Sequence, residues 1–187
     1  MKALRFYDVQ DLRYEDAPDP VIEKPDDVIV KVKAVGICGS DIARYRNLGP
    51  YVPGNVWGHE FCGEVVEVGE GVKNLKPGDR VVGCPNMVCH ECEYCKSGHP
   101  SRCENLNTIG AYVPGAYAEY IKLPEINFVK MADSMSYEQG ALVEPATVAI
   151  HGLYQNGIRS SGCWMWKYRS DGNRMGESFR SKESICN

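Results

Sequence analysis

The chain has 187 residues, a formal net charge of −4 and nine cysteines. Acidic and basic residues are interspersed without a basic block, so a role at nucleic acid or at a membrane surface has no electrostatic support. The first residues lack the apolar core of a signal peptide and no run is long enough to span a membrane. We therefore expect a cytoplasmic protein whose thiols are reduced and serve metal binding or catalysis.

Most of the chain predicts short β-strands. Alternating or apolar runs that end at Gly and Pro turns indicate strands over residues 28–35, 63–69, 80–83 and 116–123. Short strands broken by such turns are typical of a closed or nearly closed antiparallel barrel. The predicted fold class is therefore mainly β, with a few short helices.

Three helices are expected between and after these strands. One covers about residues 38–47 and follows a glycine-rich turn. Ser136 and Gln139 have the spacing of a capping box, which predicts that a second helix begins there. A third runs from about Pro145, favourable in a first turn, to Gly157, a plausible C-terminal cap.

Four cysteines in the C-x2-C-x2-C-x7-C spacing form the strongest motif: Cys89, Cys92, Cys95 and Cys103. Four thiolates can enclose one tetrahedral zinc ion of the structural type. The lobe around them, about residues 84–107, is polar and turn-rich, so a metal would have to supply its folding energy. The alternatives are four reduced surface cysteines or two disulfides in an exported protein. The C-x2-C-x2-C run is too tight for ordinary disulfides.

A second set of residues carries candidate chemistry. Cys38 lies in GICGSD, His59 and Glu60 lie in GHEFCGEVVEVG, and Glu144 lies in LVEPATVAIH. Thiolate, imidazole and carboxylate are the ligand types of an open, catalytic zinc site. Each residue alone has an ordinary explanation, such as a core cysteine, a solvated pair or a helix N-terminus. The interpretation depends on their joint occurrence with the cysteine lobe.

At this point the chain resembles the zinc-containing medium-chain dehydrogenases, in the polyol branch of sorbitol and galactitol-phosphate dehydrogenases. The matching strings, in the family's order, are GICGSD (36–41), GHEFCGEVVEVGEGV (58–72), KPGDRVV (76–82), the cysteine lobe, GAYAEY (115–120) and EPATVAIHG (144–152). The resemblance implies that residues 1–157 are a GroES-like barrel, the family's zinc catalytic domain.

The resemblance also implies roles for single residues. Cys38 and His59 would bind the catalytic zinc, with Glu60 or Glu144 as the carboxylate ligand. Ser40 would pass on the proton of the substrate hydroxyl, and Asp41 would hold the ring of His59. Many relatives have a histidine where this chain has Ala43, so the proton would leave Ser40 through water.

The implied reaction is oxidation of a small polyol or sugar-alcohol phosphate to a ketone. Zinc would act as the Lewis acid, and the hydride would pass to NAD or NADP. Relatives form homo-oligomers mostly through a Rossmann domain, so the oligomeric state of this chain does not follow from the resemblance.

Outside the motifs, four residues are expected to be structural or exposed. Cys62 and Cys84 match no ligand position and are interpreted as small core residues. His90 and His99 lie inside the lobe but are expected to be exposed, because four thiolates already satisfy the metal.

Residues 158–187 depart from the rest of the chain. They contain no Ala, Val or Leu, whereas these types form about a quarter of residues 1–157. The G-x-G-x-x-G fingerprint of a Rossmann domain, expected soon after residue 160, does not occur. One permissible codon choice read in the neighbouring frame gives GCGNTG, which suggests a frameshift. We therefore expect an aberrant, disordered tail, no Rossmann domain, and an inactive chain, because nothing would orient a nicotinamide.

Two other classes of function stay open. The chain could be a stand-alone zinc-binding GroES-like module with a binding or regulatory role, whose tail offers Trp164 and Trp166 to a partner. It could also be a structural zinc protein that never held a catalytic ion. The number of metal ions per chain distinguishes the last class from the others.

Overall fold

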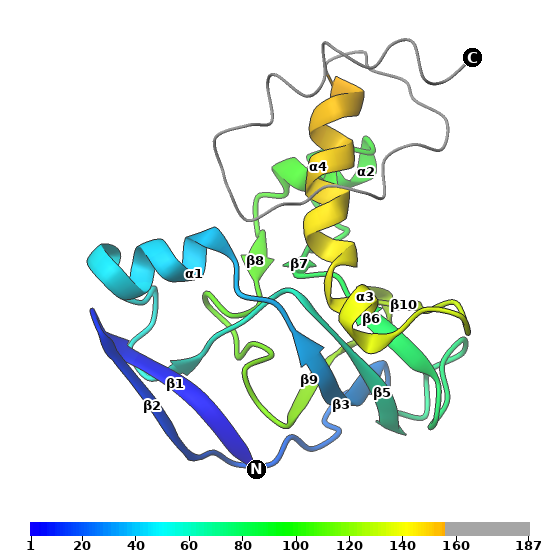
Figure 1. The fold of residues 1–187 in the computed structure, drawn as a ribbon. Coiled ribbons are helices and arrows are strands. Elements are labelled where there is room, and N and C mark those ends of the chain that lie inside the picture. The colour runs from blue at the N-terminus through cyan, green and yellow to red at the C-terminus, as the bar shows by residue number, and fades with distance from the viewer. Residues whose placement is uncertain (156–187) are drawn as a thin grey trace, which may run out of the picture. The chain divides into compact units, whose positions relative to one another are not determined.

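The computed structural model describes residues 1–155. Its framework is antiparallel β structure in three sheets (Figure 1). The largest sheet has, in spatial order, β10 (Phe128–Lys130), β6 (Arg80–Gly83), β5 (Phe61–Val68), β3 (Asp27–Val35) and β9 (Tyr120–Pro124). A second sheet has the order β2 (Asp11–Asp16), β1 (Lys2–Asp8) and β4 (Asn55–Val56). The third pairs β7 (Asn86–Met87) with β8 (Asn107–Thr108).

Strand β3 lies inside the large sheet, between β5 and β9. Val30 pairs with Val65 on β5 and with Ile121 on β9, and all three side chains are buried. The burial of these apolar side chains removes them from water and supplies the main driving force for the sheet. The alternation of apolar residues with lysines, from which the strand was predicted, is observed from Lys31 onward.

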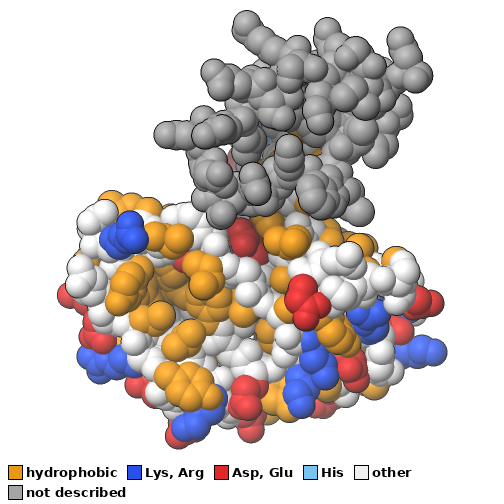
Figure 2. Space-filling model, in the orientation of Figure 1, with side chains coloured by type: hydrophobic (Ala, Val, Ile, Leu, Met, Phe, Trp, Pro, Cys, Tyr) orange, Lys and Arg blue, Asp and Glu red, His pale blue; other side chains and the backbone are white. Residues whose placement is uncertain are grey.

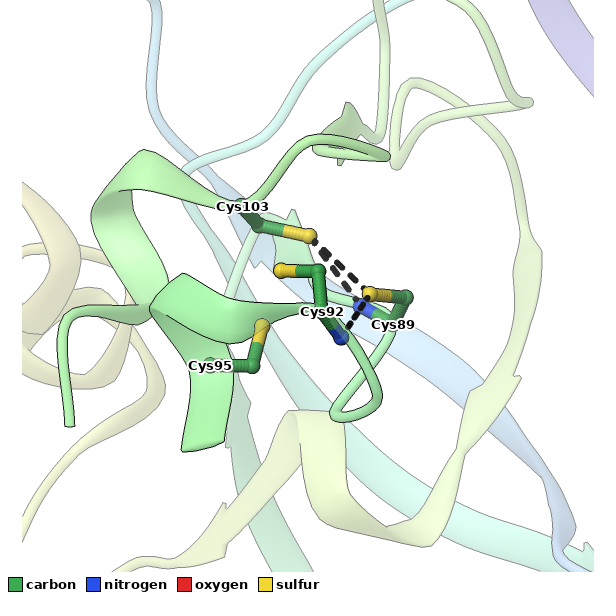
Figure 3. A group of neighbouring side chains, drawn as sticks. All are labelled: Cys89, Cys92, Cys95 and Cys103. Carbon is green, nitrogen blue, oxygen red and sulfur yellow. Dashed lines mark hydrogen bonds between the residues drawn. The ribbon is translucent and has the colours of Figure 1, made fainter. Parts of the chain in front are cut away.

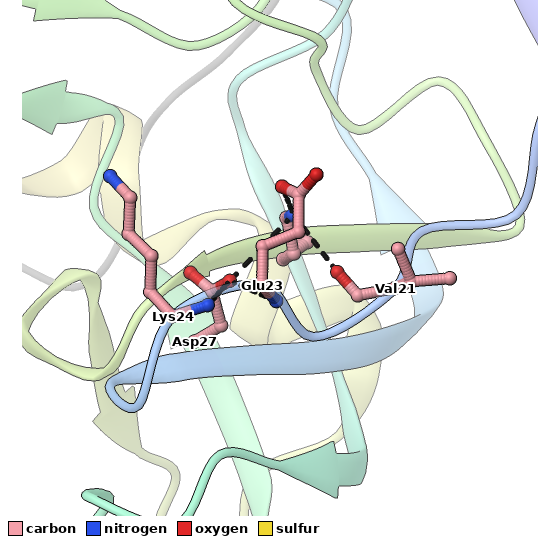
Figure 4. Close-up of polar contacts among 5 residues, drawn as sticks. Val21, Glu23, Lys24 and Asp27 are labelled. Atoms are coloured by element: carbon pink, nitrogen blue, oxygen red, sulfur yellow. Dashed lines mark hydrogen bonds and ion pairs between the residues drawn. The ribbon is translucent and has the colours of Figure 1, made fainter.

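A buried carboxylate fixes the chain where it enters β3 (Figure 4). Asp27 accepts hydrogen bonds from the backbone N–H groups of Glu23 (3.0 Å) and Lys24 (2.9 Å), and Lys122 of β9 lies 3.7 Å away. Burial acts to raise the pKa of Asp27, but these donors and the lysine charge lower it overall. Asp27 is therefore held as an anion that joins the turn, β3 and β9.

The strands predicted over residues 28–35, 63–69 and 80–83 are confirmed as β3, β5 and β6. The strand predicted over residues 116–123 is right only in its second half, because β9 begins at Tyr120. Ala116 and Tyr117 instead donate backbone hydrogen bonds to Gly58 and Trp57. The segment before β9 thus pairs with the loop that precedes β5.

Backbone bonds also join the second sheet to this segment. Leu4 of β1 donates its N–H to Tyr117, and Glu119 donates to Lys2. Together with the large curled sheet, this pairing gives the barrel-like arrangement expected of the fold, and the mainly β prediction is confirmed.

The helical elements are short, apart from the last. They are α1 (Gly39–Ala43) with the π-helical turn η1 (Arg44–Leu48), α2 (Glu93–Lys96), the 3-10 turns η2 (Pro100–Arg102) and η3 (Glu125–Asn127), α3 (Tyr137–Ala141) and α4 (Val143–Gln155). Helices were expected at three of these places. The capping box before α3 is present: Ser136 and Gln139 exchange side chain-to-backbone hydrogen bonds of 2.9 and 3.2 Å.

Helix α4 begins at Val143, two residues before the expected start at Pro145. Its expected end at Gly157 and the predictions for residues 158–187 lie outside the described residues. Residues Met1–Pro145 form one compact unit, and a second begins at Ala146. None of the helices within residues 1–155 has the length and apolar character needed to cross a bilayer.

Apolar side chains are also exposed on the first unit. Figure 2 shows hydrophobic atoms gathered over the region where Figure 1 places α1 and β1. On the α1–η1 segment, Ile42, Tyr45 and Leu48 are each at least 41% exposed.

Candidate metal centres

The four cysteines of the lobe turn their sulfur atoms toward one another (Figure 3). Their Sγ atoms all lie within 4.8 Å of one another. Cys92 caps the N-terminus of α2, Cys95 lies within that helix, and Cys103 follows η2. Two short helical turns thus bring the sequence-distant Cys103 to the C-x2-C-x2-C run.

The backbone of the lobe favours anionic sulfur. His90 has a positive φ of 58°, which bends the chain between Cys89 and the following residues. Backbone N–H groups of Glu91 and Cys92 lower the pKa of the Cys89 thiol to about 6. Desolvation and the neighbouring cysteines raise the pKa of Cys95. The backbone thus favours the thiolate of Cys89, whereas Cys95 would need a compensating cation to ionise beside its neighbours.

The lobe has almost no apolar core of its own. Between residues 89 and 107, which are all described, Cys103 is the only buried side chain. Burial cannot hold this segment in place, which agrees with the expectation that a metal would order it.

A second cluster joins two parts of the chain. One sulfur, one imidazole nitrogen and one carboxylate oxygen, from Cys38, His59 and Glu60, lie within 4.8 Å of one another. Cys38 caps the N-terminus of α1, and His59 and Glu60 immediately precede β5. The backbone bond from Gly36 N–H to the Glu60 carbonyl (2.6 Å) holds the two segments together.

Glu60 fits its place because Gly36 has no side chain. A Cβ at Gly36 would come closer than 3.0 Å to the carboxylate of Glu60. Glu60 is 8% exposed, so its carboxylate lies mostly out of contact with bulk water.

Glu144 is half-buried in the first turn of α4 and does not belong to this three-residue cluster. Desolvation raises its pKa; the charge of His59 acts in the opposite direction, and that of Glu60 adds to the rise. The carboxylate is thus near enough to interact electrostatically with both residues. Its predicted part in metal binding stays a prediction.

Asp41 connects the two segments of the cluster. Its Oδ2 accepts hydrogen bonds from the Cys38 N–H (3.0 Å) and from the hydroxyl of Tyr117 (2.8 Å). Its Oδ1 lies 3.7 Å from Nδ1 of His59, so the carboxylate faces the imidazole at more than hydrogen-bond distance. Ser40, the predicted proton carrier, is exposed in the first turn of α1.

Sequence reasoning missed Tyr117. It lies in the GAYAEY string, 76 residues from its partner Asp41, and no local pattern links the two. Desolvation and the nearby Asp41 carboxylate raise the pKa of Tyr117 far above its usual value, so the phenol is a hydrogen-bond donor over the whole working pH range.

The two remaining described cysteines differ from each other. Cys62 is fully buried, as predicted, and its thiol donates to the Tyr137 carbonyl at 2.9 Å. The prediction that Cys84 is a core residue is wrong, because its side chain is exposed just after β6 ends. His90 and His99 are exposed, as predicted.

This contrast predicts very different thiol reactivity. Burial raises the pKa of the Cys62 thiol, and α3 covers it closely: a Cβ on Gly140 would lie 2.9 Å from the Cys62 sulfur. We expect iodoacetamide to modify Cys84 quickly and Cys62 orders of magnitude more slowly, at the rate of local opening. Peptide mapping by mass spectrometry measures both rates, and denaturant should make them equal. Equal rates in the folded protein would contradict this burial.

The fold and the two clusters define a class: an antiparallel β domain with one all-cysteine and one mixed metal-ligand set. The sequence of the alcohol dehydrogenase GroES-like domain matches residues 24–133. The chain belongs to this family, and the resemblance deduced from the sequence is confirmed at that level.

Similar proteins are alcohol and polyol dehydrogenases. The sorbitol dehydrogenase of Bacillus subtilis is 40% identical over 156 residues, which cover 81% of this chain and 44% of that protein. Galactitol-1-phosphate dehydrogenase from Escherichia coli superposes with a TM-score of 0.81 at 34% identity, over 84% of this chain and 45% of that one. An Escherichia coli alcohol dehydrogenase solved with NADH has a TM-score of 0.75 at 33% identity, over 84% and 46%. This chain therefore spans about half the length of the relatives it matches.

Proposed function

We propose that residues 1–155 form the zinc-binding catalytic half of a dehydrogenase that oxidises a polyol or sugar-alcohol phosphate to a ketone, with NAD or NADP as the hydride acceptor. The convergence of Cys38, His59 and Glu60 carries the proposal. The activities named for the similar proteins support the substrate class, and the relative that was solved with NADH supports the nucleotide. The reduced thiols suit a cytoplasmic setting.

The chemistry of the two donor sets fits two different zinc sites. Sulfur, imidazole nitrogen and carboxylate oxygen from Cys38, His59 and Glu60 are three protein ligands, which leaves a position for substrate. The four sulfurs of the lobe complete a tetrahedral shell and leave none. The first set suits a catalytic ion and the second a structural ion, and Glu144 is a candidate additional ligand of the first.

Cys38, His59 and Glu60 would hold a zinc ion, which would supply Lewis-acid polarisation of an alcohol oxygen. The other steps belong to side chains of this chain. The Asp41 carboxylate, 3.7 Å from Nδ1 of His59, favours one orientation of the ring through its charge. Ser40, exposed at the start of α1, accepts the proton of the substrate hydroxyl and passes it to water, because Ala43 has no group that could relay it.

The nucleotide must be held by another domain. No G-x-G-x-x-G occurs in the sequence, and the described residues form β sheets with short helices instead of a βαβ unit. Hydride transfer needs the nicotinamide to be oriented against the carbinol carbon. We therefore expect turnover only when a nucleotide-binding domain is supplied.

A chimera tests the proposal. Residues 1–155 are joined to the nucleotide-binding half of the Bacillus subtilis sorbitol dehydrogenase, and NADH formation is followed with a panel of polyols. We expect NADH formation that His59→Ala abolishes, because the imidazole ligand is lost. His99→Ala is the matched control, since it removes an exposed histidine from the lobe and should leave the rate unchanged. A folded, zinc-loaded chimera without activity on any polyol would contradict the proposal and favour a stand-alone binding module.

A further inference from the structure

The Tyr117 side chain links three segments at the mixed metal-ligand cluster. Its hydroxyl lies 2.8 Å from Oδ2 of Asp41 and 3.1 Å from the carbonyl oxygen of Gly36. Its ring packs against Gly58, where a Cβ would lie 2.6 Å from Cδ1 of the ring. Gly58 has φ of +94°, a conformation that L side chains rarely adopt. The loop before His59 is thus shaped to admit this ring.

The hydroxyl and the ring have separable effects. The ring fills the space beside Gly58, and a phenylalanine ring would fill it equally well. The hydroxyl alone reaches Asp41, and it shares Oδ2 of that carboxylate with the backbone N–H of Cys38. Two donors on Oδ2 restrict rotation of the carboxylate, and the other oxygen, Oδ1, is the one that faces Nδ1 of His59 at 3.7 Å.

We propose that Tyr117 is a positioning residue for the centre formed by Cys38, His59 and Glu60, and that it acts by fixing the carboxylate of Asp41 against the His59 ring. This inference rests on the proposed function, because it assumes that the three residues hold a metal ion. A carboxylate that faces a ligating histidine helps to fix the ring orientation and raises metal affinity. Here Oδ1 of Asp41 faces Nδ1 of His59 at 3.7 Å, so it acts on the ring through its charge and not through a direct hydrogen bond. Loss of the hydroxyl should therefore loosen the ring and weaken metal binding while leaving the packing unchanged.

The test compares Tyr117→Phe with Tyr7→Phe in the full 187-residue chain. Tyr7 is a matched control, because its hydroxyl also donates to a carboxylate, that of Glu15 (2.5 Å). Tyr7 lies on β1 and Glu15 on β2, so this pair contains none of the proposed metal ligands. Zinc is first bound to the cysteine lobe, and cobalt(II) is then added to the second centre. The visible absorption of the bound cobalt reports the geometry of the centre. The loss of cobalt to a competing chelator reports the affinity. The signal should be absent in Cys38→Ser.

We expect Tyr117→Phe to weaken cobalt binding at this centre about tenfold and to change the visible spectrum. Tyr7→Phe should change neither, and the metal-free variants should have similar unfolding midpoints. In an Asp41→Asn background, Tyr117→Phe should have little further effect, because the hydroxyl acts through that carboxylate.

Three results would overturn this account, and they are distinguishable. Equal cobalt binding by Tyr117→Phe and the unaltered chain would overturn the role of Tyr117 alone. If Tyr117→Phe lowered cobalt affinity by the same factor in the Asp41→Asn background, the tyrosine would not act through Asp41. This result would also overturn the proposed role of Tyr117. Absence of cobalt from this centre in the unaltered chain would overturn the proposed function and, with it, this inference.

Discussion

Replacing Cys95 with serine should remove one metal ion per chain and unfold the lobe of residues 84–107, while the large sheet stays folded. The lobe has one buried side chain between residues 89 and 107, so little besides the metal can hold it. Structural zinc contributes about 10–16 kcal/mol in small zinc-dependent peptides, far more than this segment could gain from burial. The effect should therefore be close to complete loss of order in the lobe.

Amide hydrogen exchange with mass spectrometry measures this result. Peptides from the lobe should lose protection in Cys95→Ser, and peptides from β3 and β5 should keep it. Cys84→Ser is the control, because Cys84 is exposed and lies outside the four-sulfur cluster. If Cys95→Ser kept both its metal content and its protected lobe, the cluster would not be a metal site.

Gly63→Ala should cost about 3 kcal/mol or more of unfolding free energy, a large value for a single methyl group. Gly63 lies on β5 opposite Val32 of β3. An added Cβ would collide with the backbone carbonyl of Lys31 and lie 2.6 Å from Cγ1 of Val30. A backbone atom inside a paired strand cannot move aside without breaking the β3–β5 pairing, and this pairing holds the buried core.

Urea denaturation of the zinc-loaded protein measures the loss, provided that the slope with denaturant is unchanged. Gly39→Ala serves as the control, since a Cβ added at this position, at the start of α1, would have no heavy atom of another segment within 4 Å. Its effect should stay within about 1 kcal/mol and can be stabilising. Equal stability of the two variants would show that β3 and β5 are not packed as described.

Local signals in the sequence predicted much of the fold. Alternation gave β3, apolar runs between turns gave β5 and β6, and the Ser136–Gln139 pair marked the start of α3. The strand prediction for the first half of residues 116–123 failed because the backbone there pairs with Gly58 and Trp57. This long-range pairing cannot be inferred from the alternation of apolar residues. The prediction for Cys84 failed for a similar reason: no local pattern shows that its side chain, between the buried Gly83 and Pro85, faces solvent.

One candidate site could be predicted from local sequence, and the other depends on contacts between distant segments. The lobe could be found from spacing alone, because its four ligands lie within fifteen residues of sequence. Cys38, His59 and Glu60 needed residue chemistry and a family resemblance, since their proximity depends on the pairing of Gly36 with Glu60. The contact of Tyr117 with Asp41 spans 76 residues and depends on the ring packing at Gly58, so only the folded chain reveals it.

The most direct test of the account is the zinc content of the purified, folded chain, measured by native mass spectrometry and by elemental analysis. The two clusters predict two zinc ions per chain, one of which is lost in His59→Ala and the other in Cys95→Ser. One ion per chain, unaffected by His59→Ala, would contradict the account. The chain would then have a structural zinc lobe and no metal at Cys38, His59 and Glu60.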